Sequence, residues 1–215
     1  MTTFKKLFYT KQLLAKQRIE THNEEVISTI VGNLLGDGWA EKRENKTRFH
    51  IHMGSANVEY LNWLHEFFCT RGYCSTIKPT PIKQIGKKGK IYFSYKFRTW
   101  SYSSFNWLYD LFYDSTRKKK IPPNILQVLT PRALAIWLMD DGGVSGQGVK
   151  IKTEGFSFSD IEILQNSLKT RYLLITTIHC HKDKWILYFP KSELLALSKI
   201  VKPYMIPSMY YKLNN

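Results

Sequence analysis

Two stretches of similar pattern decide the fold: residues 30–38, IVGNLLGDG, and residues 134–142, LAIWLMDDG. Each is an apolar run of helical character that ends in an aspartate followed at once by glycine. The two aspartates, Asp37 and Asp141, lie about half a chain length apart in a sequence of 215 residues. An internal repeat of this size predicts that the chain is built from two similar halves.

The pattern that follows each Asp-Gly pair repeats as well. Polar and apolar residues alternate over 48–53 and over 149–153, which predicts strands with one buried face. A helix is predicted after each strand, with Ser55 and Ser157 as the expected N-caps. The remaining pattern predicts helices at 55–68, 104–113, 157–169 and 192–201 and strands at 73–78, 91–99, 173–181 and 185–189.

The repeat also suggests domain boundaries. We expect a basic N-terminal arm over 1–22, a first half over 23–121, a connecting segment over 122–130 and a second half over 131–215. An organelle-targeting presequence is the alternative interpretation of the basic arm. The connecting segment is too short to separate independent domains, so the two halves are expected to pack as a pseudo-dimer.

The composition narrows the class of protein. Lys and Arg number 32 against 17 Asp and Glu, a net charge of +15, which favours nucleic acid as the partner. Apolar residues make up 43% and aromatic residues 14%, too many for a disordered basic tail. No apolar run approaches the ~20 residues of a membrane span, so we expect no membrane partner. Three cysteines without a CxxC pair argue against a disulfide framework and a zinc module.

The two Asp-Gly endings carry a chemical implication. A carboxylate at a helix C-terminus opposes the helix dipole, and finding this placement twice suggests a compensating cation. Small residues in both runs allow the helices to approach closely, at Gly32, Gly36, Ala133 and Ala135. Paired carboxylates that hold divalent metal suit phosphodiester hydrolysis. The alternative is that each aspartate is an ordinary solvated turn residue beside a glycine helix stop.

The two stretches resemble LAGLIDADG motifs, and nearly the whole chain resembles a two-motif, monomeric LAGLIDADG homing endonuclease. The most specific parts are residues 129–131, 137–143, 202–207 and 211–213. The resemblance implies an α+β fold: a pseudo-twofold pair of αββαββα halves whose antiparallel sheets form a DNA-binding saddle. The chain departs from the motif where Ile136 replaces the small residue that Gly32 supplies in the first copy, which predicts an asymmetric helix contact.

The same resemblance implies roles for individual residues. Asp37 and Asp141 would bind Mg²⁺, with Mn²⁺ as a plausible substitute, and would orient the attacking water. Gly36 and Asp140 precede them in the same metal site, Asp140 in a structural or supporting role. The matching active-site lysines are Lys119 and Lys212. Because Lys119 lies in a basic run over 117–120, an offset of one residue or a simple solvated loop is the alternative.

Basic residues on alternating strand positions are candidates for DNA contact. A lysine-rich loop over 83–90 is expected to follow phosphates, and for each side chain an ordinary surface charge is the alternative. Apolar surroundings predict that Trp63, Trp107, Trp137 and Trp185 belong to the core. The DNA-binding candidates are Arg43, Lys46, Arg48, His50, His52, Lys83, Lys87, Lys88, Lys90, Lys96, Arg98, Lys150, Lys152, Thr153, His179, His181, Lys182 and Lys184.

The expected function is metal-dependent, site-specific cleavage of double-stranded DNA at a long asymmetric target, with a staggered cut that leaves 3′ overhangs. The alternative is an intron maturase, an RNA-binding relative that assists group I intron splicing without cutting DNA. A basic DNA-binding regulator without metal is a third class. The expected partners are double-stranded DNA and host intron RNA. The expected compartment is the mitochondrion or chloroplast for an intron-encoded protein, and otherwise the cell interior.

Overall fold

The computed structural model describes residues 22–181 and 184–213. The expected basic arm lies outside the described residues except for His22, and so does Lys182. The first unit contains α1 (Glu24–Leu35), β1 (Trp39–Arg43), β2 (Lys46–Gly54), α2 (Val58–Thr70), β3 (Ile82–Ile85), β4 (Ile91–Arg98) and α3 (Asn106–Phe112). The second contains α4 (Pro131–Asp141), β5 (Gly142–Ser145), β6 (Gly148–Lys152), α5 (Phe158–Tyr172), β7 (Thr177–His181), β8 (Lys184–Phe189) and α6 (Leu194–Val201).

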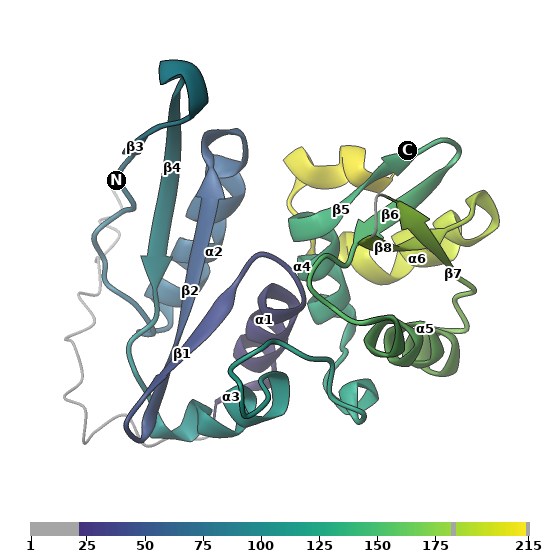
Figure 1. The fold of residues 1–215 in the computed structure, drawn as a ribbon, viewed down its shortest axis with the longest axis horizontal. Helices are drawn as coiled ribbons and strands as arrows, with labels where there is room; N and C mark the ends of the chain where they lie inside the picture. Colours follow the sequence, from purple (N-terminus) through teal and green to yellow (C-terminus); the bar gives the residue numbers. More distant parts are fainter. Residues whose placement is uncertain (1–21, 182–183, 214–215) are drawn as a thin grey trace, which may run out of the picture.

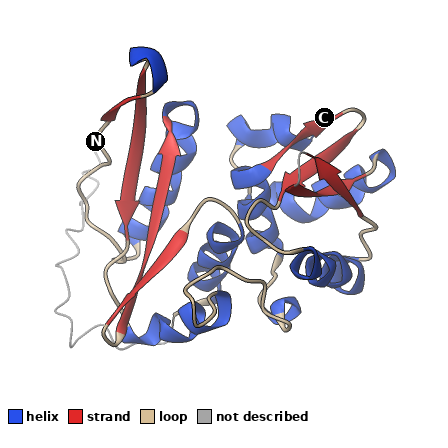
Figure 2. Ribbon diagram, in the orientation of Figure 1, coloured by secondary structure: helices blue, strands red, loops and turns tan. Residues whose placement is uncertain are grey.

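Each unit has the order αββαββα and holds one four-stranded antiparallel sheet. The strand orders are β1-β2-β4-β3 and β5-β6-β8-β7, so the second sheet repeats the topology of the first. Figure 1 shows the two units side by side, with α1 and α4 between the two sheets. Figure 2 shows, in the same orientation, that helices and strands occur together in both units. The predicted α+β fold with two pseudo-symmetric halves is confirmed.

Helices α1 and α4 pack in parallel and form the contact between the units. Asn23 caps α1 through the amide of Val26 (2.9 Å), and Thr130 caps α4 through the amide of Ala133 (3.2 Å). Near these N-termini, Arg132 of α4 is paired with Glu25 of α1 at 3.1 Å. Both helices therefore begin at the same end of the contact, and both Asp-Gly endings lie at the other end.

The approach of the two helices depends on glycine. A Cβ added at Gly32 would lie 2.5 Å from Cβ of Ile136 and 2.6 Å from the carbonyl oxygen of Ala133. A Cβ at Gly36 would lie 2.5 Å from Cβ of Asp140. The predicted asymmetry is confirmed, because Ile136 of one helix occupies the space that the missing side chain of Gly32 leaves in the other.

The core is continuous across both units. Helix α4 is buried from Ala133 to Asp140, and Trp137 is among the largest fully buried side chains. Trp63 and Trp185 are partly buried against the core, whereas Trp107 is 46% exposed, so its assignment to the core was wrong. Across the described residues, no helix is both long and apolar enough to cross a bilayer.

Local details differ from the sequence pattern in several places. Helix α2 begins at Val58 after a 3₁₀ turn over Ser55–Asn57, so Ser55 is not its N-cap, whereas Ser157 caps α5 in a capping box with Asp160. No strand spans 73–78; Cys74 forms one isolated bridge to Thr99. The strand that pairs with β4 in this region is β3, which lies further along the chain than predicted. The other predicted strand, β7, begins at Thr177 rather than at residue 173. Alternation alone did not predict the short strands β1 and β5.

Replacing Gly32 by alanine tests the helix contact. Alanine favours an isolated helix by about 1 kcal/mol over glycine, but here its methyl group must displace Ile136 and the backbone of α4. We expect Gly32→Ala to lower the free energy of unfolding by about 1–3 kcal/mol in urea titrations. The control is Gly54→Ala, because an added Cβ at Gly54 meets nothing within 4 Å. A Gly32→Ala variant more stable than wild type would contradict the close contact.

His22 joins the start of α1 to the first unit and predicts a pH dependence of stability. Its ring stacks on Phe105 at 3.9 Å and bonds to the hydroxyls of Tyr73 and Ser104, both at 2.8 Å. Burial lowers the pKa of His22 from 6.5 to about 4. Because the unfolded chain then binds a proton that the folded chain does not, stability is expected to fall as the pH drops from 6.5 toward 4.

The measurement is urea unfolding at several pH values for wild type and His22→Gln. The difference in stability between the two proteins should shrink below pH 6.5 and stay constant between pH 7 and 8, where His22 is neutral in both states. A constant difference over the whole range would show that His22 is not buried in its neutral form.

Candidate functional site

The two Asp-Gly endings meet at one place. The backbone amide of Asp37 donates a hydrogen bond to Oδ2 of Asp140, at 3.2 Å, so the end of α1 contacts the end of α4. Asp37 and Asp141 both line a cavity of about 390 Å³, together with Lys119 and Lys152. The remaining lining residues are Leu35, Gly36, Glu154, Gly155 and Phe156.

A lysine from each half reaches its own motif. Nζ of Lys119 donates to the carbonyl oxygens of Gly36 (3.2 Å) and Gly38 (2.8 Å). Nζ of Lys212 donates to the carbonyl oxygens of Met139 and Asp140, the latter at 3.2 Å. Gly36 and Asp140 occupy equivalent positions in the two motifs, so one contact of each lysine is pseudo-symmetric, whereas the second acceptors, Gly38 and Met139, are not equivalent. The structure thus brings together all four residues expected at the catalytic centre.

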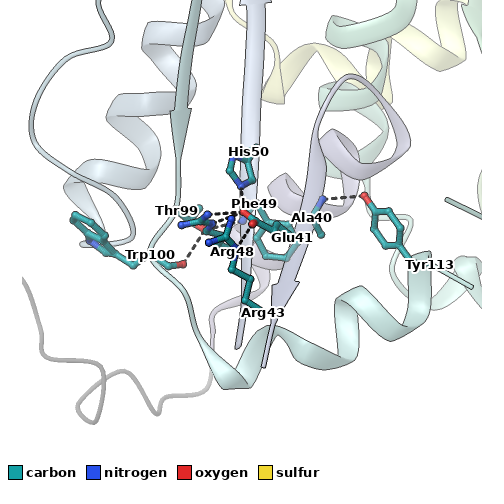
Figure 3. A network of polar contacts seen from close by, with 9 residues as sticks. All are labelled: Ala40, Glu41, Arg43, Arg48, Phe49, His50, Thr99, Trp100 and Tyr113. Carbon is teal, nitrogen blue, oxygen red and sulfur yellow. Dashed lines mark hydrogen bonds and ion pairs between the residues drawn. The ribbon is translucent and has the colours of Figure 1, made fainter. Parts of the chain in front are cut away.

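A rigid turn determines which lysine of the basic run enters the site. Oδ1 of Asp114 accepts hydrogen bonds from the backbone amides of Thr116 (2.8 Å) and Lys118 (2.9 Å). The chain then pairs Lys119 with Tyr113 in an isolated bridge, which directs Lys119 toward Gly36. The hydroxyl of Tyr113 also accepts from the amide of Ala40 at 2.9 Å, tying this turn to the start of β1 (Figure 3).

Asp140 has a buried position that differs from that of its neighbour Asp141. Its Oδ1 accepts a hydrogen bond from the hydroxyl of Tyr60 at 2.8 Å, and its Oδ2 accepts from the amide of Asp37. The carboxyl group is buried against Gly36, where a side chain would collide with it. This geometry fits the expected structural role: Asp140 fastens one motif to the other, and its backbone carbonyl faces Lys212.

The electrostatics of the site follow from burial and close charges. Burial and, next, the charge of Asp37 raise the pKa of Asp141 to about 7, against the opposing effect of Lys119 and Lys212. Burial also raises the pKa of Asp37 and lowers that of Lys119 to about 8. Desolvation therefore disfavours the ionised forms of both aspartates and of both lysines, Lys119 and Lys212. A cation near the carboxylates would offset this desolvation penalty, because it favours their charged form.

The donor set fits a hard divalent cation that also binds other ligands. Carboxylate and carbonyl oxygens are the ligands that Mg²⁺ prefers, and Mg²⁺ commonly keeps waters and substrate phosphates in its shell. Asp37 and Asp141 supply the carboxylates. Within the described residues there is no group of three or more His, Cys, Asp or Glu side chains placed to enclose a metal.

The first sheet has a polar face opposite its helices. By strand register, this polar face carries Trp39, Glu41, Arg43, Lys46, Arg48, His50, His52, Lys96 and Arg98. The buried alternate positions of β2 confirm the predicted alternation of that strand. Lys83 pairs with Phe93 and so lies on the opposite face from Lys96 and Arg98. Lys87, Lys88 and Lys90 lie at the turn between β3 and β4.

A carboxylate organises part of this polar face. Oε2 of Glu41 pairs with Nη2 of Arg48 at 2.6 Å and with Nε2 of His50 at 2.9 Å, and Oε1 contacts Arg43 (Figure 3). The ring of His50 stacks on Trp39, with centroids 5.0 Å apart and an angle of 7° between the planes. Arg48 and His50, both expected DNA contacts, are thus held in fixed positions by a residue that the sequence analysis did not single out.

The second sheet presents a smaller polar face. Lys150 and Lys152 lie opposite Tyr188 and Ile186, and His179 follows on β7 with Nε2 2.7 Å from the hydroxyl of Thr177. Lys184 pairs with Glu154 at the exposed edge. His181 ends β7. Thr153 was wrongly assigned to this face: it is buried, and its hydroxyl donates to the carbonyl of Trp185 at 2.6 Å.

Comparison with known proteins agrees with this arrangement. The model of the LAGLIDADG DNA endonuclease family matches residues 27–197, which span both motifs and both sheets. The chain belongs to the LAGLIDADG DNA endonuclease family. The structure is also similar to that of the homing endonuclease I-WcaI bound to its DNA recognition sequence, with a TM-score of 0.83 and 28% sequence identity over 93% of this chain and 90% of that one.

Curated relatives include proteins named as maturases and proteins named as endonucleases. The cytochrome b mRNA maturase bI2 of Saccharomyces cerevisiae is 41% identical over 203 residues, covering 90% of this chain and 48% of the relative. The chain thus spans about half the length of that relative. The intron-encoded endonuclease ai4 of Dictyostelium discoideum is 39% identical over 157 residues, covering 70% of this chain and 98% of the relative.

Two supporting residues of the LAGLIDADG site were missed from sequence. Tyr60 lies in the apolar pattern of α2, where a tyrosine is usually core, and no local signal marks its bond to Asp140. Glu41 lies four residues after Asp37, and its pairing with Arg48 follows from the register of β1 and β2. A correct prediction of the two-residue turn at Glu44 and Asn45 would have revealed that pairing.

Variants of Asp140 test its structural role. We expect Asp140→Ala to lower the free energy of unfolding by about 1–3 kcal/mol or more, because it leaves the Tyr60 hydroxyl and the Asp37 amide without their buried acceptor. Asp140→Asn keeps one acceptor oxygen and nearly the same volume, so it should cost less. Urea unfolding of both variants is the measurement, with Asp141→Asn as the neighbouring control. Equal stability of Asp140→Ala and wild type would contradict the role.

Proposed function

We propose that this protein is a metal-dependent endonuclease that cuts double-stranded DNA at a specific, long and asymmetric target. The observation that supports it most is the shared cavity in which Asp37 and Asp141, from the two motifs, meet Lys119 beside a pair of basic sheet faces. The similarity to a DNA-bound homing endonuclease over nearly the full chain supports the same proposal.

The aspartates and the lysines of the site have different proposed roles. Asp37 and Asp141 would hold divalent metal, Mg²⁺ or in its place Mn²⁺, next to the backbone carbonyls of Gly36 and Asp140, which accept hydrogen bonds from Lys119 and Lys212. A bound divalent cation supplies Lewis-acid stabilisation of the attacking and leaving oxygens of the phosphodiester. Lys119 and Lys212 are held by backbone carbonyls, so their ammonium groups are pre-positioned to stabilise charge that develops on the phosphate.

The two halves act on different sequences. Because one motif and one lysine belong to each half, we propose that each half cuts one strand, giving a staggered break with 3′ overhangs. The polar faces of the two sheets differ in nearly every residue, so a monomer of this kind fits an asymmetric target. The proposed DNA contacts are the basic residues of these faces and of the β3–β4 turn, without Thr153.

RNA binding is the second candidate function. The Saccharomyces cerevisiae relative, 41% identical to this chain, is named as an mRNA maturase, and the same basic faces are available to a structured RNA. We infer that DNA cleavage is the better proposal for this chain because both aspartates and both lysines are present and lie at the ends of α1 and α4. Names of several relatives refer to introns, which supports an intron-encoded protein working in a mitochondrion or chloroplast.

Cleavage of a randomised duplex DNA library, with and without Mg²⁺, tests the proposed function. We expect cleaved products with a common sequence only in the presence of Mg²⁺ or Mn²⁺, and their loss after chelation by EDTA. Asp37→Asn and Asp141→Asn should each reduce double-strand cleavage at least about 100-fold, because each removes a metal-binding carboxylate, while duplex binding persists.

Asp110→Asn is the matched control, since it removes a surface carboxylate on α3, away from the cavity, and should cut normally. Selective binding of group I intron RNA, with no duplex cleaved in any metal, would favour the maturase function instead. Cleavage that survives both aspartate substitutions would contradict the assignment of the site.

A further inference from the structure

We propose that Glu41 is a specificity-determining residue: it holds Arg48 as a donor for guanine and His50 as an adjacent acceptor in the major groove. This inference rests on the proposed binding of double-stranded DNA. It concerns a carboxylate in the middle of a basic surface, which by itself repels phosphate and weakens general affinity for DNA. We infer that the carboxylate of Glu41 instead increases discrimination between bases.

The geometry of Arg48 leaves its reading edge available. Oε2 of Glu41 accepts from Nε of Arg48 at 2.7 Å and lies 2.6 Å from its Nη2. These two contacts restrain the plane of the guanidinium group. Within the described part of the chain, Nη1 of Arg48 has no hydrogen-bond partner. A guanidinium held from behind in this way can present Nη1 and the second N–H of Nη2 to O6 and N7 of guanine.

His50 is held in one tautomer. Burial alone would raise the pKa of Glu41, but the hydrogen bonds from Arg48, His50 and Arg43 outweigh that effect and lower the pKa to about 2. Because an ionised carboxylate only accepts, Nε2 of His50 carries the hydrogen. Burial lowers the pKa of His50, so Nδ1 remains an acceptor. Stacking on Trp39 fixes the ring plane. An acceptor there matches the N–H groups of cytosine N4 or adenine N6.

Three side chains of the cluster are less exposed than the ion pair of the second half. The side chains of Glu41, Arg48 and His50 are 26%, 18% and 17% exposed, against 51% and 55% for the Glu154–Lys184 pair in the second half. Isolated exposed pairs contribute little, whereas several charges that form a network contribute more. The groove of about 770 Å³ that His50 and Trp39 line also includes Lys96 and Arg98, so the cluster borders a surface large enough for base edges.

The second half lacks an equivalent cluster among its described residues. Ser145 follows Asp141 by four residues, as Glu41 follows Asp37, and it pairs with Gly148 where Glu41 pairs with Arg48. A cluster needed for folding of the repeated unit would be expected in both halves. Its presence in one half fits a role in reading that half of an asymmetric target.

The test compares base preferences of full-length variants. Wild-type protein is used to select duplexes from a randomised double-stranded DNA library without divalent metal, so that no duplex is cut. Binding of every single-base-pair change in the selected duplex is then measured for wild type, Glu41→Gln, Glu41→Asp and Arg48→Ala. Asp110→Asn is the matched control: its carboxylate pairs at 2.7 Å with Lys42, next to Glu41, on the opposite face of the sheet.

We expect Glu41→Gln to lose about tenfold or more of the discrimination at one or two adjacent base pairs, one of them a guanine, while the general affinity rises or stays unchanged. Arg48→Ala should lose discrimination at the same guanine, and the Glu41→Gln/Arg48→Ala double variant should lose no more at that guanine than Arg48→Ala alone. Glu41→Asp keeps the charge but retracts it from His50, so a similar loss is expected. Asp110→Asn should keep the wild-type preferences.

The possible failures are distinguishable. If wild-type protein selects no duplex, the proposed function fails, and this inference with it. If wild type selects a duplex but Glu41→Gln and Asp110→Asn share its base preferences, only the inference about Glu41 is overturned. Additive losses at the guanine in the Glu41→Gln/Arg48→Ala double variant would also overturn it, since Glu41 and Arg48 would then act independently at that base pair.

Discussion

The contact between α1 and α4 is the constraint on which the rest of the structure depends. Gly32 in α1 and Gly36 at its C-cap carry no side chain, and Ile136 and Asp140 of α4 fill the space. With helices this close and parallel, their ends cannot diverge, and the two Asp-Gly endings are placed in contact. If α1 and α4 were further apart, each unit would still have its own sheet and motif, but the two motifs would not line one cavity.

Asp140 links this helix contact to the chemistry beside it. Its carboxyl group is buried with two hydrogen bonds, from Tyr60 of α2 and from the backbone of Asp37. Burial raises its pKa well above the usual range, as the charge of Asp37 does to a lesser extent. The adjacent Asp141 instead lines the cavity. Asp140 and Asp141 therefore have different environments: Asp140 lies inside the contact between α1 and α4, and Asp141 faces the cavity. The reason is that consecutive residues of a helix point in different directions.

Much of this arrangement could be predicted from sequence because it depends on repeated local patterns. Small residues on helical spacing, the two Asp-Gly endings and the alternation in β2 each point to one structure. Register and turn geometry were less accessible. Glu44 adopts φ 51° in a turn without the usual Asn-Gly signal, so the pairing of Glu41 with Arg48 had no visible marker. Thr153 follows Lys152 by one residue, and alternation places it on the buried side.

The difference between the two halves is the last consequence of the fold. Pseudo-symmetry is closest where the motifs and lysines meet, since Lys119 and Lys212 each bond to the carbonyl that precedes the last aspartate of their own motif. It is lost on the sheets, where β2 has nine residues and β6 has five. The core and the cavity require matching halves to bring two carboxylates together. The polar faces are free of that requirement, so the charged cluster around Glu41 can exist in one half without a counterpart among the described residues of the other.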